Sequence, residues 1–463
     1  EYLRAINLIR RSVPLPASLG RVCFRPCETV CRRGEIDSPI AIDHLKRYIS
    51  EKGYAKNKSV LFPFNTPELL NQKKDSKKIA IIGAGPSGLS AAYFLRIMGR
   101  EVTVFEKEKL AGGLLAYGIP SYRLPKKVVQ DEINLIKAMG VKIKTNSSIR
   151  TNTQWRNITK NFDAVFIAVG SSKSRSLGVV GENSKEVIDA LQFLNDVISG
   201  KRKRVPARIA VIGGGNSAID SARSALRLGA KEVTVIYRRS KDEMPAHKDE
   251  IEDAMAEGVQ FKFLAAPSSV KCEPCQGGVT GIQCVQMELG PADKDGRRKP
   301  VPIKDSEFMV ETDMIITAIS QSPDLEFIGT DVELTKWGGI KVNPITMETS
   351  IKGVFAGGDC ITNAGMVVYA IATGQKAAVA IDKYLGGQGK LPDNIDLVLA
   401  NTTDLKGPHD PLKDDRQKIQ HIPVNTRCNN FKEVIKGYPD SAAYKEATRC
   451  LRCDLENKEY KAR

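Results

Sequence analysis

A segment that occurs twice constrains this chain more than any other feature of its sequence. Residues 79–106 read IAIIGAGPSGLSAAYFLRIMGREVTVFE, and residues 209–239 read IAVIGGGNSAIDSARSALRLGAKEVTVIYRR. Each copy runs from a hydrophobic strand through a glycine turn into a helix, and then into a second strand that contains EVTV. This is the βαβ pattern of dinucleotide-binding folds. The sequence therefore predicts an α/β protein with two Rossmann-type domains.

The glycines of the first copy have separate roles in holding a dinucleotide. Gly83 permits the tight turn after the strand, Gly85 lets the backbone approach a pyrophosphate, and Gly88 lets the helix pack on the strand. The helix N-terminus supplies amide donors to the phosphates. The two predicted phosphate loops comprise Gly83, Ala84, Gly85, Pro86, Ser87 and Gly88 in the first copy and Gly213, Gly215, Asn216, Ser217 and Ala218 in the second.

The second strands of the two copies end in residues of opposite charge. Glu106, followed by Lys107, closes the first strand, and a carboxylate there accepts hydrogen bonds from ribose hydroxyls and repels a 2′-phosphate. The second strand ends at Tyr237, followed by Arg238 and Arg239, and guanidinium groups suit a phosphate. We therefore predict FAD at the first loop and NADPH at the second. The alternative is that the two arginines form a solvated turn.

Charge and hydropathy limit the function classes open to the chain. Its 463 residues carry a net charge of +16, which is either a solvated basic surface or a docking face for an acidic protein such as a ferredoxin. Nucleic acid is disfavoured as a partner because aromatic residues make up only 6% of the chain. No apolar run approaches the roughly 20 residues of a membrane span, and no export signal is found. We therefore expect a cytoplasmic protein.

Five further blocks make the chain recognisable. From about residue 19 to 385 it resembles the small subunit of NADPH-dependent glutamate synthase. The same module occurs in dihydropyrimidine dehydrogenase and in the large subunit of NADH-dependent ferredoxin:NADP oxidoreductases. The blocks that carry the resemblance are GGLLAYGIPSYRLP at 112–125, FDAVFIAVG at 162–170, YRRSKDEMPAHKDE at 237–250, DMIITAIS at 313–320 and GVFAGGD at 353–359.

The resemblance implies further cofactor-binding residues. GVFAGGD reads as a buried strand that ends in Gly358 and Asp359, which would receive flavin ribityl hydroxyls before a helix that begins near Met366 and Val367. Around FAD, the family pattern points to Gly113, Leu114, Arg123 and Ile149. On the nicotinamide side it points to Ala318, Ile319 and Ser320, where family members often have glycine in place of Ser320. No catalytic acid, base or nucleophile is nominated, because hydride transfer needs ring stacking and exclusion of water.

The 10 cysteines are unevenly placed, which favours metal or redox chemistry over a disulfide framework. GRVCFRPCETVCRRG, with Cys23, Cys27 and Cys31, resembles half of a family module that holds two [4Fe–4S] clusters. The remaining ligands would come from an upstream cysteine-rich segment or another subunit, and buried structural cysteines are the alternative. Cys450 and Cys453 either ligate a cluster or zinc with cysteines from elsewhere or bind nothing. For Cys272 and Cys275 a turn with inert thiols is favoured.

These readings combine into a domain plan and a function. We expect an incomplete helical iron–sulfur segment at 1–75, a flavin domain at 76–190 and 329–388, an NADPH domain at 191–328, and an extension at 389–463. The predicted function is an FAD-dependent NAD(P)H oxidoreductase subunit of a multi-subunit complex. It would pass electrons between NADPH, FAD and [4Fe–4S] clusters, to or from a partner subunit or ferredoxin. The alternatives are a non-catalytic cofactor-binding subunit that organises a redox complex, and a stand-alone flavin oxidoreductase with another acceptor.

Overall fold

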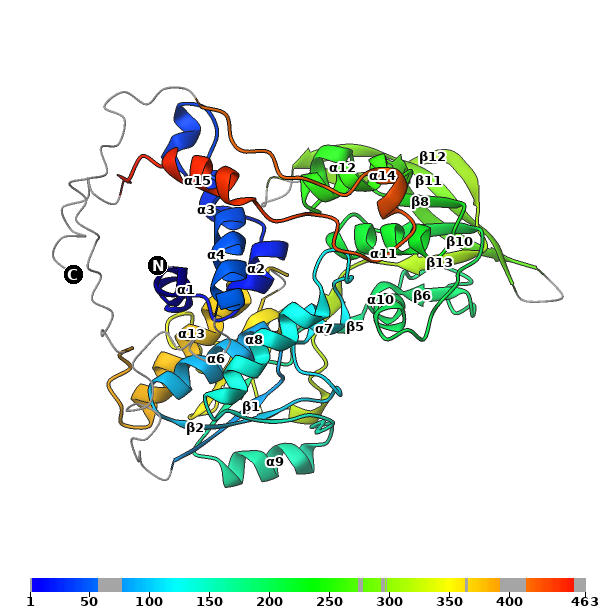
Figure 1. Ribbon diagram of the computed structural model, residues 1–463. Helices are drawn as coiled ribbons and strands as arrows, with labels where there is room; N and C mark the ends of the chain where they lie inside the picture. The colour runs from blue at the N-terminus through cyan, green and yellow to red at the C-terminus, as the bar shows by residue number, and fades with distance from the viewer. Residues whose placement is uncertain are drawn as a thin grey trace.

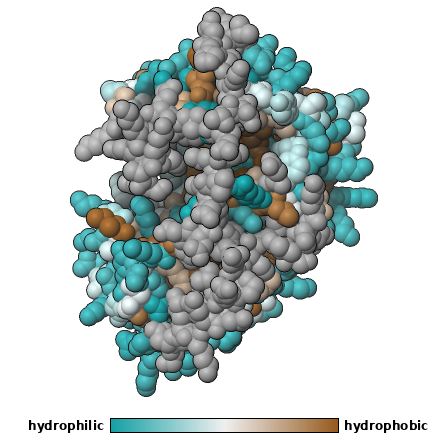
Figure 2. All heavy atoms as spheres, turned by 60° about the vertical axis from the view of Figure 1, so that its left-hand side comes forward, coloured by the Kyte–Doolittle hydropathy of each residue, from teal (hydrophilic) through white to brown (hydrophobic). Residues whose placement is uncertain are grey.

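The structure is a computed structural model that describes residues 2–56, 77–273, 278–292, 296, 298–362, 365–391 and 414–453. Two α/β domains lie beside each other, and a helical segment from the start of the chain packs against them (Figure 1). Hydrophilic side chains cover most of the described surface on the face shown in Figure 2. No described helix combines the length and the apolar character that crossing a membrane requires.

The first domain is built on a parallel sheet with the strand order β15-β4-β1-β2-β3. Its central strands are apolar along their length because helices cover both faces of the sheet. The strands are β1 (Lys78–Ile82), β2 (Glu101–Phe105), β3 (Lys142–Lys144), β4 (Ala164–Ile167) and β15 (Val354–Ala356). The helices are α6 (Pro86–Ile97), α7 (Leu114–Tyr117), α8 (Lys126–Ala138), α9 (Asn152–Asn161), η3 (Glu326–Ile328), η4 (Gly358–Cys360) and α13 (Val367–Tyr384).

The second domain repeats this plan with the strand order β6-β13-β7-β8-β9, again all parallel. Its strands are β6 (Val187–Asp189), β7 (Arg208–Ile212), β8 (Glu232–Tyr237), β9 (Gln260–Phe263) and β13 (Met314–Thr317). Its helices are α10 (Ala190–Ile198), α11 (Asn216–Arg227), η2 (Lys241–Glu243) and α12 (Lys248–Ala256). An antiparallel sheet of β10 (Ala265–Cys272), β11 (Val279–Ala292) and β12 (Arg298–Glu311) adjoins it (Figure 1), and within this sheet β11 and β12 form a long ribbon.

The second domain is inserted into the first, because β15 returns to pair with β4 after the second sheet is complete. The two connections between the domains pair as a short antiparallel ladder of β5 (Lys173–Ser174) and β14 (Gln321–Ser322). The insertion was expected from the sequence. β6 already belongs to the second sheet, so that sheet starts before residue 191, where the sequence placed the boundary.

A buried carboxylate joins the N-terminal segment to the first domain. This segment contains α1 (Tyr2–Arg10), α2 (Pro16–Val22), α3 (Pro26–Thr29), η1 (Arg32–Glu35) and α4 (Ile42–Lys56). Glu132 of α8 is fully buried and accepts hydrogen bonds from the Ala17 amide at 2.7 Å and the Ser18 amide at 2.9 Å, both at the start of α2. The Tyr54 hydroxyl donates to the same carboxylate at 3.0 Å. The donors satisfy a charge that burial alone would make costly.

The C-terminal tail crosses from the second domain to the N-terminal segment (Figure 1). Its helices are α14 (Val424–Arg427) and α15 (Asp440–Thr448). The Val434 amide donates to the Tyr122 carbonyl of the first domain at 2.8 Å, and the Ala41 amide of the N-terminal segment donates to Glu446 of the tail at 2.8 Å. The tail therefore contacts every other part of the described structure, a role that its sequence did not predict.

Candidate functional site: two dinucleotide loops and a cysteine segment

The loop between β1 and α6 has room for a ligand only where a phosphate is expected. Gly83 has φ of +103°, and a Cβ there would lie 2.4 Å from the Ala168 carbonyl oxygen. A Cβ on Gly88 would lie 2.0 Å from the carbonyl oxygen of Gly83. At Gly85, by contrast, the nearest atom is 4.0 Å away, and no side chain caps the helix that begins at Pro86. Open space beside uncapped amides at a helix N-terminus fits a pyrophosphate.

Glu106 is fixed beside this loop. Its side chain is buried, and it accepts the Ala84 amide at 2.7 Å and the Glu108 amide at 2.9 Å. Burial raises the pKa of its carboxyl group, and the two amides oppose that rise. Each carboxylate oxygen can accept a further hydrogen bond, so the group fits a ribose diol. Lys107 is exposed and lies 3.4 Å from the Ser172 hydroxyl.

The turn after β15 closes on the start of α6. The Gly358 amide donates to the Thr373 hydroxyl at 2.8 Å, and a Cβ on Gly358 would lie 2.9 Å from the Cβ of Ser87. Asp359 follows, and burial raises its pKa to about 6 although the Gly365 amide hydrogen-bonds to the carboxylate. A half-buried carboxylate with so few donors fits ribityl hydroxyls. Met366 stands at the N-cap position of α13 without a capping side-chain hydrogen bond, and Val367 is the first residue of the helix.

The other residues predicted to contact FAD differ in how well their positions agree with that prediction. A Cβ on Gly113 would lie 2.9 Å from the Cα of Gly85, so the GGLL turn borders the phosphate loop. Leu114 is exposed, and Ile149 packs on the core beneath the sheet. Arg123, which the sequence predicted to lie around FAD, points its charge toward the second domain instead. Its guanidinium lies 2.8 Å from Asp220 and 3.0 Å from Glu250, so its charge is neutralised by the second domain. Its contact with FAD stays a prediction that these ion pairs do not support.

The second loop repeats the first with one change. Gly213 has φ of +142°, and a Cβ there would lie 2.2 Å from the Ala318 carbonyl oxygen. At Gly215 no atom lies within 4 Å of the position that a Cβ would take, which leaves open space above the helix. Ala218, where the first copy has glycine, is fully buried. The loop is anchored at Asn216, whose side-chain oxygen accepts the His247 amide at 3.0 Å. Ser217 is half-buried beside it.

The end of β8 carries the predicted 2′-phosphate residues. Arg238 is exposed, and within the described residues it makes no hydrogen bond or ion pair. The Arg239 Nε donates to the Arg298 carbonyl at 2.8 Å. The predicted nicotinamide residues lie at the end of β13 beside the domain connections: Ala318 is buried, Ile319 is half-buried and Ser320 is exposed.

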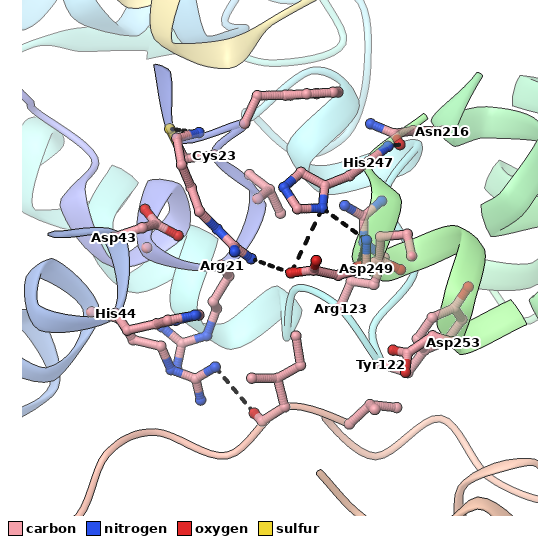
Figure 3. A pocket seen from close by; sticks show the side chains of 18 of the residues that line it. Arg21, Cys23, Asp43, His44, Tyr122, Arg123, Asn216, His247, Asp249 and Asp253 are labelled. Carbon is pink, nitrogen blue, oxygen red and sulfur yellow. Dashed lines mark hydrogen bonds and ion pairs between the residues drawn. The ribbon is translucent and has the colours of Figure 1, made fainter. Parts of the chain in front are cut away.

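Of the three N-terminal cysteines, Cys23 lines a pocket between the helical segment and the second domain. Cys23 lines this pocket with Asn216 and His247, and an ion pair of 3.0 Å joins Arg25 to Asp249 across it (Figure 3). Burial raises the pKa values of the Cys23 and Cys27 thiols, and the charge of Cys23 further raises that of Cys27.

The described cysteines do not complete a metal site. Cys27 is exposed and Cys31 half-buried, and nowhere in the described ranges do three or more His, Cys, Asp or Glu side chains converge as metal ligands. The role of Cys23, Cys27 and Cys31 as cluster ligands stays a prediction. Cys272 is half-buried beside the Ser184 hydroxyl, while Cys275 falls outside the described residues.

The C-terminal cysteine pair lies next to the N-terminal segment that contains Cys31. Arg33, two residues after Cys31, donates to the Arg449 carbonyl at 3.1 Å. Cys450 follows directly and is exposed, and Cys453 is half-buried. Sequence reasoning treated the two cysteine groups separately, because residues 31 and 450 carry no shared local pattern. Their role as ligands stays a prediction.

Sequence reasoning also missed a buried charge cluster between the domains and the tail. Asp220, Glu250, Asp253 and Glu257 face arginines at distances of 3.2 Å or less. A signal was present in the sequence, because Arg223 and Arg227 are spaced i, i+4 and the carboxylates repeat at helical spacing. The arginines are Arg123, Arg223, Arg227 and Arg427.

Comparisons with known proteins agree with this arrangement. A family model described as pyridine nucleotide-disulphide oxidoreductase matches residues 59–377. A second, described as dihydropyrimidine dehydrogenase domain II, 4Fe-4S cluster, matches residues 1–58. Together they confirm the expected cofactors: FAD, NADP(H) and a [4Fe–4S] cluster.

Several curated proteins are similar over most of the chain. The NADP(+)-dependent formate dehydrogenase subunit beta of Moorella thermoacetica is 42% identical over 98% of this chain and 67% of its own length. The NADPH-Fe(3+) oxidoreductase subunit beta of Geobacter sulfurreducens is 37% identical over 98% of this chain and 71% of its own. The glutamate synthase [NADPH] small chain of Escherichia coli is 34% identical over 83% of this chain and 84% of its own length. The resemblance seen in the sequence is thereby confirmed.

Solved structures confirm the fold class. Mycobacterium tuberculosis FprA in complex with NADPH superimposes with a TM-score of 0.57 at 18% identity, covering 67% of this chain and 85% of FprA. The thioredoxin reductase of T. acidophilum gives a TM-score of 0.51 at 23% identity, covering 67% of this chain and 99% of the reductase. At these identities the comparison concerns the fold alone.

Proposed function

Because the chain belongs to the pyridine nucleotide-disulphide oxidoreductase family, we propose that it is an FAD-dependent NADPH oxidoreductase subunit. In this proposal it passes electrons between NADPH, FAD and [4Fe–4S] clusters, to or from a partner subunit or a ferredoxin. The observation that carries the proposal is the pair of open phosphate loops with opposite charges at their ribose ends. Glu106 is buried beside the first, and Arg238 and Arg239 follow the second.

The chain's own residues bind and orient two cofactors. Glu106 and Asp359 would hold the sugar and ribityl hydroxyls of FAD, and the amides that follow Gly85 would hold its pyrophosphate. Arg238 and Arg239 would hold the 2′-phosphate of NADPH. When bound, the flavin supplies two-electron chemistry with nicotinamide and one-electron chemistry with iron–sulfur clusters. Hydride transfer between nicotinamide and flavin requires no side-chain proton transfer, because it depends on ring stacking and exclusion of water.

The relatives support a partner subunit. Two of them are named as beta subunits and one as a small chain. The exposed Cys27 and Cys450 lie at the end of the molecule where the iron–sulfur segment is open to solvent. We therefore place the partner, or the remaining cysteine-rich segment, at this end.

Anaerobic reduction tests the proposal. NADPH should bleach the flavin absorbance of the purified, FAD-loaded protein, and NADH should do so more slowly at the same concentration. If neither nucleotide bleaches the flavin, the chain is a non-catalytic subunit that only organises a larger complex. Equal rates with the two nucleotides would show that Arg238 and Arg239 form a solvated turn.

Replacing Glu106 with alanine should weaken FAD retention. The change removes the acceptor for the ribose hydroxyls and for the Ala84 amide, and each such hydrogen bond contributes about 1–3 kcal/mol. FAD should therefore dissociate at least about tenfold more readily, measured as flavin per polypeptide after gel filtration. Glu101→Ala is the control, because Glu101 lies exposed at the start of β2, the strand that Glu106 follows. Equal flavin content in the two variants contradicts the assignment of Glu106.

Replacing Cys27 with serine should lower the iron content of the completed assembly. The test uses the chain expressed with its partner subunit or its cysteine-rich segment, because among the described residues no three His, Cys, Asp or Glu side chains converge as metal ligands. Iron analysis and EPR should show a lost or altered cluster, while NADPH still bleaches the flavin. Cys272→Ser is the control, since that thiol lies in the second domain beside Ser184. An assembly that binds no iron at all would make the three N-terminal cysteines structural.

A further inference from the structure

The ribbon of β11 and β12 returns to the nucleotide end of the second domain. Ala292 pairs with Arg298 at the end of the ribbon next to the connection between the two strands. Arg298 is the first residue of β12. Its backbone and side chain both contact residues that follow β8, the strand that carries the predicted 2′-phosphate residues. The ribbon thus brings a third arginine to Arg238 and Arg239.

Three contacts fix Arg298 there. Its carbonyl accepts the Arg239 Nε at 2.8 Å, its amide donates to Glu243 at 3.1 Å, and its own Nε lies 3.3 Å from the same carboxylate oxygen. The first contact holds Arg239 by its Nε. The Arg298 side chain likewise reaches Glu243 through its Nε, and that side chain is 52% exposed. Both residues therefore keep terminal guanidinium nitrogens for a ligand.

Glu243 is itself tied to the phosphate loop. It forms a capping box with Ser240 at the start of η2, and the Tyr237 hydroxyl donates to its carbonyl at 2.8 Å. The ring of Tyr237 packs on Gly214, where a Cβ would lie 2.5 Å from the ring. Burial opposes ionisation of Glu243, yet hydrogen bonds from Ser240 and Arg298 leave its pKa below the usual value. A continuous set of contacts thus runs from the second phosphate loop to Arg298.

The net positive charge of the side chains beside the end of β8 favours binding of an anion. Arg238, Arg239 and Arg298 bring three positive charges, and Glu243 neutralises one of them. A phosphate monoester carries about −1.5 to −2 charges at neutral pH, which matches the remaining two. We propose that Arg298 is a specificity-determining residue for the 2′-phosphate of NADPH, and that its backbone carbonyl positions Arg239. The inference rests on the proposed binding of NADPH to the second domain.

Calorimetry with two small probes tests this proposal without reference to activity. Adenosine 2′,5′-bisphosphate carries the 2′-phosphate, and AMP lacks it. Arg298→Gln in the FAD-loaded protein should weaken binding of the bisphosphate about threefold to tenfold, as expected for one charge-assisted contact at a partly exposed site. Binding of AMP should be unchanged. The backbone carbonyl survives this substitution, so the variant measures the side chain alone.

Lys304→Gln is the matched control. It removes the same charge from the same strand, six residues or about 20 Å farther along β12, where Lys304 is exposed. If the two variants bind the bisphosphate equally, Arg298 serves only to pair with Glu243 and the proposal is overturned. If the unaltered protein does not distinguish the bisphosphate from AMP, the proposed NADPH site itself fails. The two failures are therefore distinguishable.

Discussion

Replacing Glu257 with alanine should lower the free energy of unfolding by about 3–5 kcal/mol, the cost of leaving buried charges without a partner. The Glu257 side chain is fully buried. It lies 2.6 Å from Arg223, 2.7 Å from Arg227 and 2.8 Å from Arg427. These arginines are themselves at most 4% exposed, so water cannot take the place of the carboxylate.

The same change should loosen the tail. Arg427 belongs to α14, and its two ion pairs with Asp253 and Glu257 attach the tail to α12. Urea unfolding measures the loss of stability, and limited proteolysis measures release of the tail. Glu326→Ala is the control, because its pair with Lys173 is exposed and should contribute about 0–1 kcal/mol. A Glu257 variant that unfolds like the Glu326 variant would show that the buried cluster adds nothing to stability.

Replacing Arg238 and Arg239 together with alanine should weaken NADPH binding by about 2–5 kcal/mol, the cost measured when one side of a close charge pair is truncated. This corresponds to at least about a 30-fold rise in Kd. NADH lacks the 2′-phosphate, so its Kd should change little. The physical reason is the position of both residues directly after β8, beside the open loop at Gly215.

Equilibrium titration with each nucleotide measures this change, and anaerobic bleaching of the flavin provides a second readout. The control removes two positive charges from α9 of the first domain by Arg156→Ala and Lys160→Ala, because these side chains lie on a helix remote from the second loop. That variant should keep the NADPH preference. If the Arg238 and Arg239 variant keeps it as well, the second domain selects NADPH by other residues, and the charge argument is wrong.

Much of the fold and of the two loops could be predicted from the sequence because the interactions that form them are local. The steric demand at Gly88 comes from the carbonyl of Gly83, five residues earlier, and Glu106 reaches the Ala84 amide within one βαβ unit. Within such a unit, strand and helix periodicity and the absence of a Cβ define the backbone path. The insertion of the second domain followed from the order of the motifs.

The sequence by itself thus determined the two Rossmann-type folds, the positions of the two glycine loops and the opposite charges that follow β2 and β8. Only the tertiary structure decided which partners Arg123 takes, where the tail docks and that Arg298 stands beside Arg239. These contacts join residues far apart in the chain: 97 positions separate Arg123 from Asp220, and 412 separate Arg449 from Asp37. A charged side chain carries no local sign of which distant opposite charge will neutralise it, because that choice is made when whole domains pack and exclude water from the pair.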